Sequence, residues 1–517
     1  MKDYPPFALR VQGEKHKKNN LICQDFADKY SDENMSIVAV ADGHGSDQYF
    51  RSDLGSHFAV EVALHSIKQF IDVNPLCNAD LVNKERKDKL EDLSRNIMQA
   101  WYEKVDEHEA ANPLKSDPKL ATIEEKYRTR YLNDGARKYI YHAYGTTLIA
   151  VAMTQDFWFG VHVGDGKCEV LFDDGTWDQP IPWDDRCFLN STTSICDEAS
   201  YRNGFRFWFG FQNEDKSFSD FRYGIDSQNK DQSKNIYSRP VAIFIGSDGV
   251  DDTYPVHENE KHLQNLYRNF VLSFAANGFD RTTGQIFEIA KKLADQGSQD
   301  DVSIAGIVGE LTPAFVDFLT LQALADKENE KAIEERKKVV AKEQAVQGAQ
   351  AKAEKMNNSV LNIRKEEQLA KKELDQKLSE LERLKNNKIW IKNSIQKTEQ
   401  DIRNATQKHK KLKADLLIAE GDLSAQQQIV RANENDKVTA EMQARKQEEI
   451  SKSFYIKVND YRIGIEKPII SPSVRDGLGQ FGMGVTQTVF NVVDVASELT
   501  EDLMKLIDNS LGANKNQ

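Results

Sequence analysis

Cysteine and long apolar runs are scarce in this chain. Its five cysteines are too few and too scattered for a disulfide framework, and no two of them form the C-x-x-C pair that is typical of zinc sites. The longest apolar runs, for example residues 148–153, are much shorter than a membrane span, and the first residues lack a basic segment followed by an apolar one. We therefore expect a protein of the reducing cytoplasm that has no membrane partner.

A surplus of positive charge is also absent. The formal net charge is −13 and 29% of the residues are charged, so both signs are abundant and the excess is acidic. No nucleic-acid partner is expected, because binding to phosphate backbones depends on clustered basic side chains. At 517 residues the chain is too long for one core and should form roughly two to four structural units.

Up to about residue 311 the composition is typical of a globular domain. Apolar segments with strand character occupy residues 36–41, 146–153, 157–163, 241–247 and 302–308. Because nearly every residue in them is apolar, both faces of these strands should be covered. Residues 54–70 and 81–108 show helical spacing and a charged segment follows at 112–139, so we expect helices outside a pair of sheets.

Proline and glycine nearly disappear in the next part of the chain. No proline occurs between Pro313 and Pro468, and Lys, Glu, Gln, Ala and Leu dominate, which is the composition of long helices. An alternating four-three spacing places ten residues on one helical seam: Ile391, Ile395, Thr398, Ile402, Ala405, His409, Leu412, Leu416, Ala419 and Leu423. A second seam, which begins at Leu374, is out of phase with it, so a turn or stammer is expected near Asn386. Further turns are expected at 357–359, 421–422 and 433–436.

The seam needs a partner helix, which either the chain itself, by folding back, or another chain would supply. The expected turns favour hairpins within one chain, whereas the regular seam also suits a parallel dimer, and we favour a homo-oligomer by a small margin. After a glycine-rich stretch, heptad spacing from Val485 to Leu506 predicts a last helix. Its acidic polar face would repel anionic lipid, so it is expected to dock on protein. We therefore predict coiled-coil helices over 313–455 and a C-terminal unit over 456–517.

Chemistry is first indicated where one apolar strand ends, in the sequence Val-Ala-Asp-Gly-His-Gly-Ser over residues 40–46. The Asp42 carboxylate offers hard oxygen ligands, and Gly43 lets a backbone carbonyl approach the same cation with no side chain in the way. Alone, the segment is equally compatible with a tight turn after a buried strand.

Three further acids shift this balance. Asp248 follows an apolar strand, Asp300 precedes one, and Asp165 lies in a turn between two strands. Carboxylates at strand ends can converge on one side of a sheet pair, and ligation by oxygen alone favours Mg²⁺ or Mn²⁺ over zinc. The sequence therefore predicts a hard-cation site.

Six short motifs together resemble the metal-dependent protein phosphatase 2C family. They stand in the family's order and begin at Cys23, Ala41, Tyr144, Val163, Ser247 and Ser298. The resemblance implies an α+β fold, an α-β-β-α sandwich of two antiparallel sheets that hold a binuclear Mg²⁺ or Mn²⁺ centre. We accordingly predict a catalytic domain over residues 1–312.

The resemblance also implies a role for each residue of this centre. Asp42 would bridge both metals, Asp248 and Asp300 would complete one site, and the Gly43 carbonyl would serve the other. Asp25 would hold metal-bound water. A third, weaker ion would lie between Asp165 and Asp248.

Two positions depart from the family pattern. Gln24-Asp25 stands where Glu-Asp is usual, which removes one carboxylate from the second metal, and a bacterial branch with this Gln-Asp form has a histidine at the position of His16. Asn20 replaces an arginine that often binds phosphate. His16 and Lys18 are therefore the candidates for phosphate binding, and a role as solvent-exposed loop residues is the alternative for both.

The implied reaction is direct hydrolysis of phosphoserine and phosphothreonine. A water that bridges the two cations attacks phosphorus in line, while the cations neutralise charge on the phosphoryl group. His44, beside the bridging Asp42, is the expected general acid for the departing alkoxide. None of the five cysteines lies in a phosphate-loop setting, which argues against a cysteine phosphatase.

Two alternative functions stay open at this point. Because Gln24 weakens one metal site, one alternative is a phosphatase-like binding module; the other is a scaffold that assembles partners through the coiled coil. For the phosphatase, the expected substrate is a phosphorylated protein. Bacterial relatives with the Gln-Asp form often accompany a serine/threonine kinase, so a cognate kinase and a role in signalling are expected by analogy.

Overall fold

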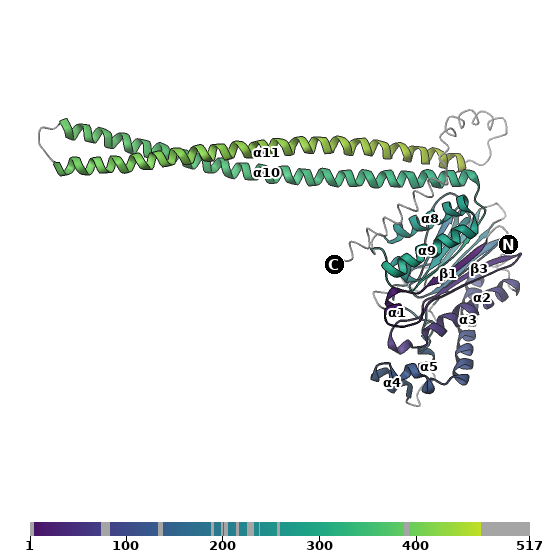
Figure 1. The fold of residues 1–517 in the computed structure, drawn as a ribbon. Coiled ribbons are helices and arrows are strands. Elements are labelled where there is room, and N and C mark those ends of the chain that lie inside the picture. Colours follow the sequence, from purple (N-terminus) through teal and green to yellow (C-terminus); the bar gives the residue numbers. More distant parts are fainter. Residues whose placement is uncertain are drawn as a thin grey trace, which may run out of the picture. The chain divides into compact units, whose positions relative to one another are not determined.

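The computed structural model describes residues 5–73, 83–132, 138–187, 191–197, 200, 205–213, 217–224, 232–236, 238–255, 259–386 and 392–466. The chain divides into two compact units (Figure 1). One comprises residues 1–323 with 460–517, and the other comprises residues 324–459. Each unit is described separately below.

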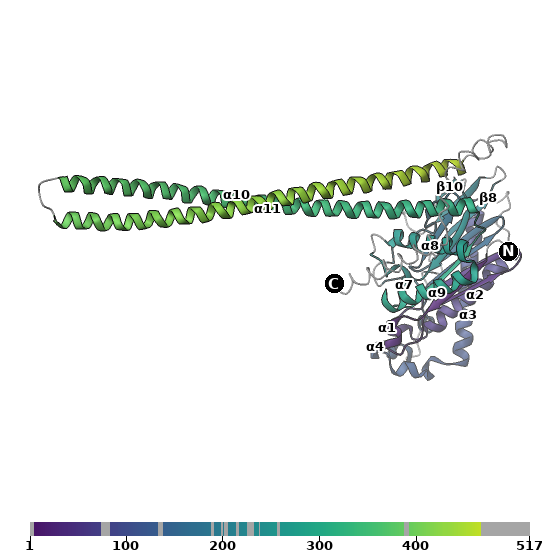
Figure 2. The same cartoon turned by 45° about the horizontal axis from the view of Figure 1, so that its top comes forward.

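The first unit contains a sandwich of two sheets (Figures 1 and 2). The larger sheet has the strand order β10 (Gln232–Ile236), β9 (Phe218–Tyr223), β8 (Arg206–Gln212), β5 (Phe157–Val163), β4 (Leu148–Thr154), β3 (Met35–Ala41) and β2 (Phe26–Ser31). The smaller sheet has the order β1 (Pro6–Val11), β12 (Val302–Val308), β11 (Pro240–Gly246), β6 (Lys167–Phe172) and β7 (Trp177–Asp178). All strand pairs that the structure describes are antiparallel.

Alternate side chains of the apolar strands fill the space between the two sheets. Val38 and Val40 of β3 belong to the same buried cluster as Ile243 and Ile245 of β11. Ile37 points to the opposite face of β3, where it joins a second cluster that includes residues of the outer helices. The expectation that these strands are covered on both faces is therefore confirmed.

Helices cover the outer face of each sheet. Helices α2 (Ser52–Val73) and α3 (Asn83–Ala111) lie on the larger sheet, and α8 (Asn259–Asn277) and α9 (Phe279–Gln296) lie on the smaller one (Figure 1). On the smaller sheet the Phe244 ring stacks on Tyr267 of α8 with centroids 4.6 Å apart. Burial of each such side chain stabilises the fold by about 1.5 to 3 kcal/mol. The α-β-β-α sandwich of two antiparallel sheets is confirmed.

The elements predicted from the sequence agree closely with those observed in the sandwich. The five apolar segments are strands β3, β4, β5, β11 and β12, and the two segments with helical spacing are α2 and α3. The charged segment that follows contains two short 3-10 helices, η2 (Leu114–Ser116) and η3 (Pro118–Ala121), before α4 (Glu125–Leu132) and α5 (Lys138–His142). Seven further strands, β1, β2 and β6 to β10, were not predicted.

Two long helices, α10 (Pro313–Asn386) and α11 (Lys392–Glu466), form a hairpin (Figures 1 and 2). Ion pairs between them join residues whose numbers rise along one helix and fall along the other: Lys342 to Asp436 at 2.8 Å, Arg364 to Glu420 at 2.5 Å and Lys385 to Glu399 at 3.6 Å. The two helices are therefore antiparallel. The long helical region expected after residue 313 is confirmed.

The predicted seam faces α10 from Ile395 onward, and its first residue, Ile391, lies outside the described residues. Thr398 and Ala405 on the seam are buried, whereas Leu417 beside it is 73% exposed. Helix α10 ends at Asn386, where a break was expected. The turns expected at 357–359, 421–422 and 433–436 are wrong, because both helices continue through them. The hairpin gives the seam a partner within one chain, and self-association stays a prediction.

No helix in the described part of the chain is long and apolar enough to span a membrane. The docking helix predicted from Val485 to Leu506 lies outside the described residues.

Candidate functional site

Strand directions bring two acids to one edge of the larger sheet. In an antiparallel pair, the end of one strand lies beside the start of its neighbour. Asp25 immediately precedes β2 and Asp42 immediately follows β3, and the adjoining residues Phe26 and Ala41 pair directly across the two strands. The two carboxylates are therefore neighbours although the strands run in opposite directions.

The smaller sheet brings further acids to the same edge by the same rule. Asp248 follows β11 and Asp300 precedes β12, which are antiparallel neighbours. Asp165 lies in the turn that joins β5 of the larger sheet to β6 of the smaller one. The preceding Gly164 has a φ of +116°, which favours glycine. The structure therefore brings together the five acids predicted from the sequence.

Hydrogen bonds from the neighbouring threonine motif hold the loop after β3 in place. The backbone carbonyl of Asp42 accepts from Thr146 Oγ1 at 2.7 Å and from the Thr147 amide at 2.8 Å. A Cβ atom on Gly43 would lie 2.5 Å from the backbone oxygen of Gln24, so only glycine fits there without movement. The Ala-Asp-Gly-His and Tyr-Gly-Thr-Thr motifs are thus parts of one local structure.

The loop after β11 is packed against the start of β12. Ser247 donates its amide to the Ser303 oxygen, and the Ser303 amide donates to Ser247 Oγ, each at 3.0 Å. Asp248 then begins the short helix α7 (Asp248–Asp251). A Cβ atom on Gly249 would overlap the carbonyl oxygen of Asp301, which explains the glycine of the Ser-Asp-Gly motif.

The carboxyl groups at this edge disfavour one another's ionisation. Burial raises the pKa of Asp42 well above its usual range, and the charges of Asp248 and Asp25 add to the effect. Burial raises the pKa of Asp25 to about 8, with the charge of Asp301 next in importance. It raises the pKa of Asp248 to about 7, with the charge of Asp165 next. The acids therefore lie close enough for strong repulsion.

A divalent cation fits this group of acids. Asp25 is 2% exposed, and its Oδ2 atom is buried with no hydrogen-bond partner. Buried carboxylates are costly as anions unless a cation or hydrogen-bond donors compensate them. Because every side-chain ligand atom in the group is a carboxylate oxygen, the ligand set suits Mg²⁺ or Mn²⁺ better than zinc.

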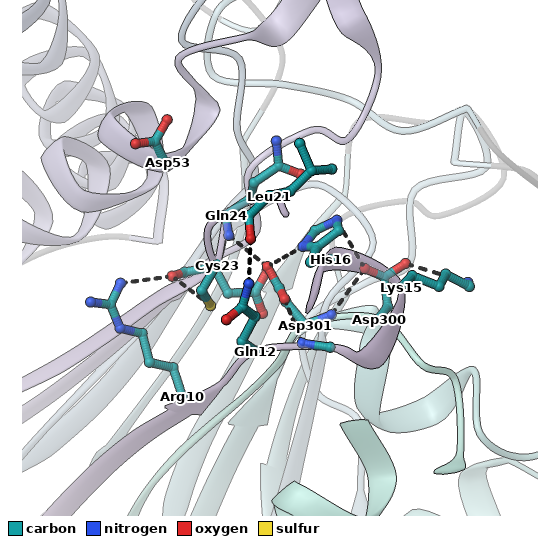
Figure 3. A network of polar contacts seen from close by, with 12 residues as sticks. Arg10, Gln12, Lys15, His16, Leu21, Cys23, Gln24, Asp53, Asp300 and Asp301 are labelled. Atoms are coloured by element: carbon teal, nitrogen blue, oxygen red, sulfur yellow. Dashed lines mark hydrogen bonds and ion pairs between the residues drawn. The ribbon is translucent and has the colours of Figure 1, made fainter. Parts of the chain in front are cut away.

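Asp301 ties the first motif to the last one and was not singled out by the sequence (Figure 3). Its carboxylate accepts from the Gly13 amide at 2.7 Å and the Gln24 amide at 2.5 Å, and His16 Nδ1 lies 2.8 Å from it. Burial acts to raise its pKa, but the bonds from His16 and from the two amides hold that pKa below the usual range. Asp301 is therefore a buried acceptor with several partners, whereas the side chain of the neighbouring Asp300 is 48% exposed.

The two residues predicted to bind phosphate occupy different surroundings. His16 is 9% exposed and points at Asp301 (Figure 3), and that hydrogen bond raises its pKa. Lys18 is exposed and lies 3.5 Å from Glu14. Lys15, which the sequence did not single out, places its Nζ 3.8 Å from Asp300. The phosphate-binding roles of His16 and Lys18 stay predictions, and Lys15 joins them as a candidate.

His44 lies on the loop that follows Asp42. Its amide donates to the Gly145 oxygen at 3.1 Å, and its ring meets Tyr49 edge-on with centroids 4.7 Å apart. Burial of the ring, with a smaller effect from the charge of His142, lowers its pKa to about 4. In the free chain the imidazole is therefore neutral at neutral pH.

A family model of protein phosphatase 2C matches residues 12–295, which are more than half of the chain. This chain belongs to the protein phosphatase 2C family. The matched range carries four of the five strand-end acids and His44, and it ends shortly before Asp300, which the pairing of β11 with β12 brings to the same edge. No curated protein matches the chain significantly.

Among solved structures, similar chains include three phosphatases. A bacterial serine phosphatase is 13% identical, with a TM-score of 0.34, and the match covers 60% of this chain and 99% of that one. The catalytic domain of the serine/threonine phosphatase PstP, in complex with two manganese ions, is 14% identical with a TM-score of 0.32, covering 59% and 98%. Stp1 from Staphylococcus aureus is 13% identical with a TM-score of 0.33, covering 60% and 96%.

Proposed function

We propose that the sandwich is a Mg²⁺- or Mn²⁺-dependent protein serine/threonine phosphatase. The observation that carries this proposal is the set of strand-end acids at one edge of the two sheets: Asp25, Asp42, Asp165, Asp248 and Asp300. Family membership supports a phosphate ester as the substrate class. The raised pKa values of Asp25 and Asp248 support a cation as the missing compensation.

The roles of the acids in this proposal follow from their positions. Asp42, Asp248 and Asp300 would hold two cations together with the Gly43 carbonyl, and Asp25 would bind water in the outer shell. Asp165 with Asp248 would hold a third, weaker ion. When bound, the cations supply an activated water and neutralise charge on the phosphoryl group.

His44 is proposed to give a proton to the leaving serine or threonine oxygen. An imidazole with a pKa of about 4 is a poor general acid in the free chain, because it is already deprotonated at neutral pH. A phosphate dianion bound beside the ring favours the imidazolium form and raises its pKa. His44 would therefore become an acid in the complex with substrate, when a proton is needed.

Phosphate binding is assigned to the basic residues of α1 (Glu14–Lys18). Lys15 is the favoured contact, since its ammonium already lies 3.8 Å from Asp300. His16 would act indirectly by holding Asp301, with Lys18 as a more distant positive charge. The substrate would be a phosphorylated protein, and a cognate serine/threonine kinase is the proposed partner of the same signalling system.

The test is release of inorganic phosphate from phosphoserine and phosphothreonine peptides by the full chain. We expect hydrolysis with Mn²⁺ or Mg²⁺ and none in the presence of a chelator. Tight binding of the phosphopeptide in Mn²⁺ without hydrolysis would instead support the alternative, a phosphatase-like binding module. If the chain neither hydrolyses nor binds the phosphopeptide, both of these functions are refuted and a scaffold role for the helical hairpin remains.

A further inference from the structure

A second group of metal-ligating side chains lies outside the acidic edge. His142, Cys196 and Asp197 each offer one ligand atom, and these atoms lie within 4.8 Å of one another. Ligand atoms around one tetrahedral zinc ion lie roughly 3 to 4 Å apart, since zinc bonds nitrogen at about 2.0 Å and sulfur at about 2.3 Å. We propose that these three residues bind one zinc-like transition-metal ion and that this ion restrains His44.

The three ligands lie on two segments that are joined by hydrogen bonds. His142 ends α5, and the Gly145 amide donates to its backbone oxygen at 3.1 Å. The turn that carries Cys196 is attached to Thr146, whose oxygen accepts from the Ile195 amide at 2.9 Å and from Ser194 Oγ at 3.1 Å. The site would therefore be largely preformed, because both backbones are already positioned.

The donor chemistry separates this site from the acidic edge. A thiolate, an imidazole and one carboxylate suit zinc and its transition-metal neighbours, whereas carboxylates alone suit Mg²⁺ or Mn²⁺. Ser194 Oγ lies 3.1 Å from Cys196 Sγ and would support a metal-bound sulfur from the outer shell. Three protein ligands leave a fourth position for water.

Oxidation is a weaker alternative use of this cysteine. Cys196 is 4% exposed, so an oxidant in solution has little access to its sulfur. The Cys196 sulfur contacts Ser194 Oγ at 3.1 Å and Asp197 Oδ1 at 3.9 Å. The ligand set accounts for the imidazole and the carboxylate beside the thiol, which a redox role would not require.

One aromatic ring connects the group to His44. The Tyr49 ring lies 4.7 Å from His44 and 6.5 Å from His142 between centroids. A Cβ atom on Gly145 would lie 2.5 Å from the Tyr49 ring and 2.9 Å from the His44 ring, so these rings pack tightly against Gly145. A bound dication would hold His142 in place and, through the Tyr49 ring, inhibit movement of the His44 ring during catalysis. This inhibitory effect rests on the proposed acid role of His44, whereas metal binding does not.

Cobalt(II) is the probe for binding, because a cobalt–thiolate bond has a charge-transfer absorption in the near ultraviolet. We expect the full chain, in excess Mg²⁺, to develop this band with about one Co²⁺ per chain. Cys196→Ser should abolish the band, His142→Asn should weaken binding at least about tenfold, and the buried control Cys168→Ala should keep it. No band in the wild type, or an equal band in Cys196→Ser, would overturn the site.

A zinc inhibition assay then tests the effect on catalysis. In excess Mn²⁺, added Zn²⁺ should inhibit phosphopeptide hydrolysis by the wild type and by Cys168→Ala. Cys196→Ser should keep its activity without zinc and resist this inhibition. Equal inhibition of the wild type and Cys196→Ser would overturn the restraint on His44. If the chain hydrolyses no phosphopeptide, the proposed function fails, while the cobalt spectrum still decides the metal site.

Discussion

The sandwich and the helical hairpin use charged residues in opposite ways. At the sandwich edge Asp25 is 2% exposed, and burial raises its pKa to about 8. In the hairpin, Lys342 and Asp436 pair at 2.8 Å with side chains that are 47% and 58% exposed. An exposed pair contributes about 0 to 1 kcal/mol, whereas a buried, uncompensated carboxylate is costly. Charge density therefore does not locate the site in this chain, whereas the convergence of carboxylates at one sheet edge does.

The apolar cores of the two units explain why only one of them tolerates such a cost. The sandwich strands are buried on both faces, and their side chains join two large clusters. The hairpin has a small buried cluster of Val339, Ala440 and Ala444. A fold with a large reserve of apolar burial can hold repelling acids at its edge, and a two-helix hairpin cannot.

The largest expected effect is that of Asp248→Asn on catalysis. The change removes a charge without removing volume, so the fold should persist while Mn²⁺-dependent phosphopeptide hydrolysis falls by about a hundredfold or more. Circular dichroism checks the fold and phosphate release checks the activity. Asp280→Asn, at an exposed acid on α9, is the matched control and should keep full activity. Near-full activity of Asp248→Asn would refute the assignment.

His44→Gln should have a smaller effect that depends on the leaving group. Loss of a general acid should slow hydrolysis of a phosphoserine peptide by roughly a hundredfold, because an alkoxide needs a proton. An aryl phosphate, whose leaving group is stable without a proton, should be slowed much less. Equal losses of turnover on both substrates would point to a structural role for the ring.

Ala444→Asp should destabilise the hairpin, because it introduces there a buried carboxylate like the one at the sandwich edge. Ala444 is 0% exposed, so the variant places an uncompensated carboxylate between α10 and α11 and should destabilise their pairing by a few kcal/mol. Faster limited proteolysis within residues 324–459 would report this loss, and phosphatase activity should persist.

Lys342→Ala is the control for that experiment. It breaks the exposed pair with Asp436 and should change the stability of the hairpin by about 0 to 1 kcal/mol. If Lys342→Ala opened the hairpin as far as Ala444→Asp does, the claim that a buried charge costs more stability than the loss of an exposed ion pair would be refuted.

The pH dependence of stability should differ between the metal-free and metal-bound sandwich. The folded pKa values of Asp25 and Asp248, about 8 and about 7, exceed the usual aspartate value of about 4. At pH values between the usual aspartate pKa and these raised pKa values, the folded chain binds more protons than the unfolded chain. The free energy of unfolding therefore decreases as the pH rises. In chelator, the Tm should fall between about pH 5 and about pH 8 more steeply in the wild type than in Asp248→Asn.

Added Mn²⁺ should restore the Tm most strongly at the upper end of that range, where the carboxylates are ionised and repel one another. Differential scanning calorimetry measures both slopes. A metal-free Tm that rises across the range with the same slope in both proteins would contradict the raised pKa values.

Much of the sandwich could be predicted because its central strands are apolar on nearly every residue. Such strands must be covered on both sides, and their ends mark the edges where Asp42, Asp248 and Asp300 appear. Strands β8 and β9 were missed although they are rich in aromatic residues, and β10 is polar at every position but Ile236. In the hairpin, asparagine and Gly421 were weighted as helix breakers, but each costs a helix about 1 kcal/mol or less, and the pairing of the two helices outweighs it.

The finer features of the site depend on contacts between distant segments. The sequence does not distinguish which of two consecutive acids turns inward, and the structure buries Asp301 through the amides of Gly13 and Gln24. The orientation of His16 follows from that burial. Similarly, His142 and Cys196 are far apart in the chain, so spacing rules for zinc could not pair them.

The most direct test of the central claim is a Mn²⁺ titration of the full chain at neutral pH, followed by electron paramagnetic resonance of the free ion. If the strand-end acids hold the catalytic cations, the wild type should bind about two ions. Asp248→Asn should lose at least one of them, and Asp280→Asn should lose none. A folded wild-type chain that binds no Mn²⁺, or an Asp248→Asn variant that binds as the wild type does, would contradict the account.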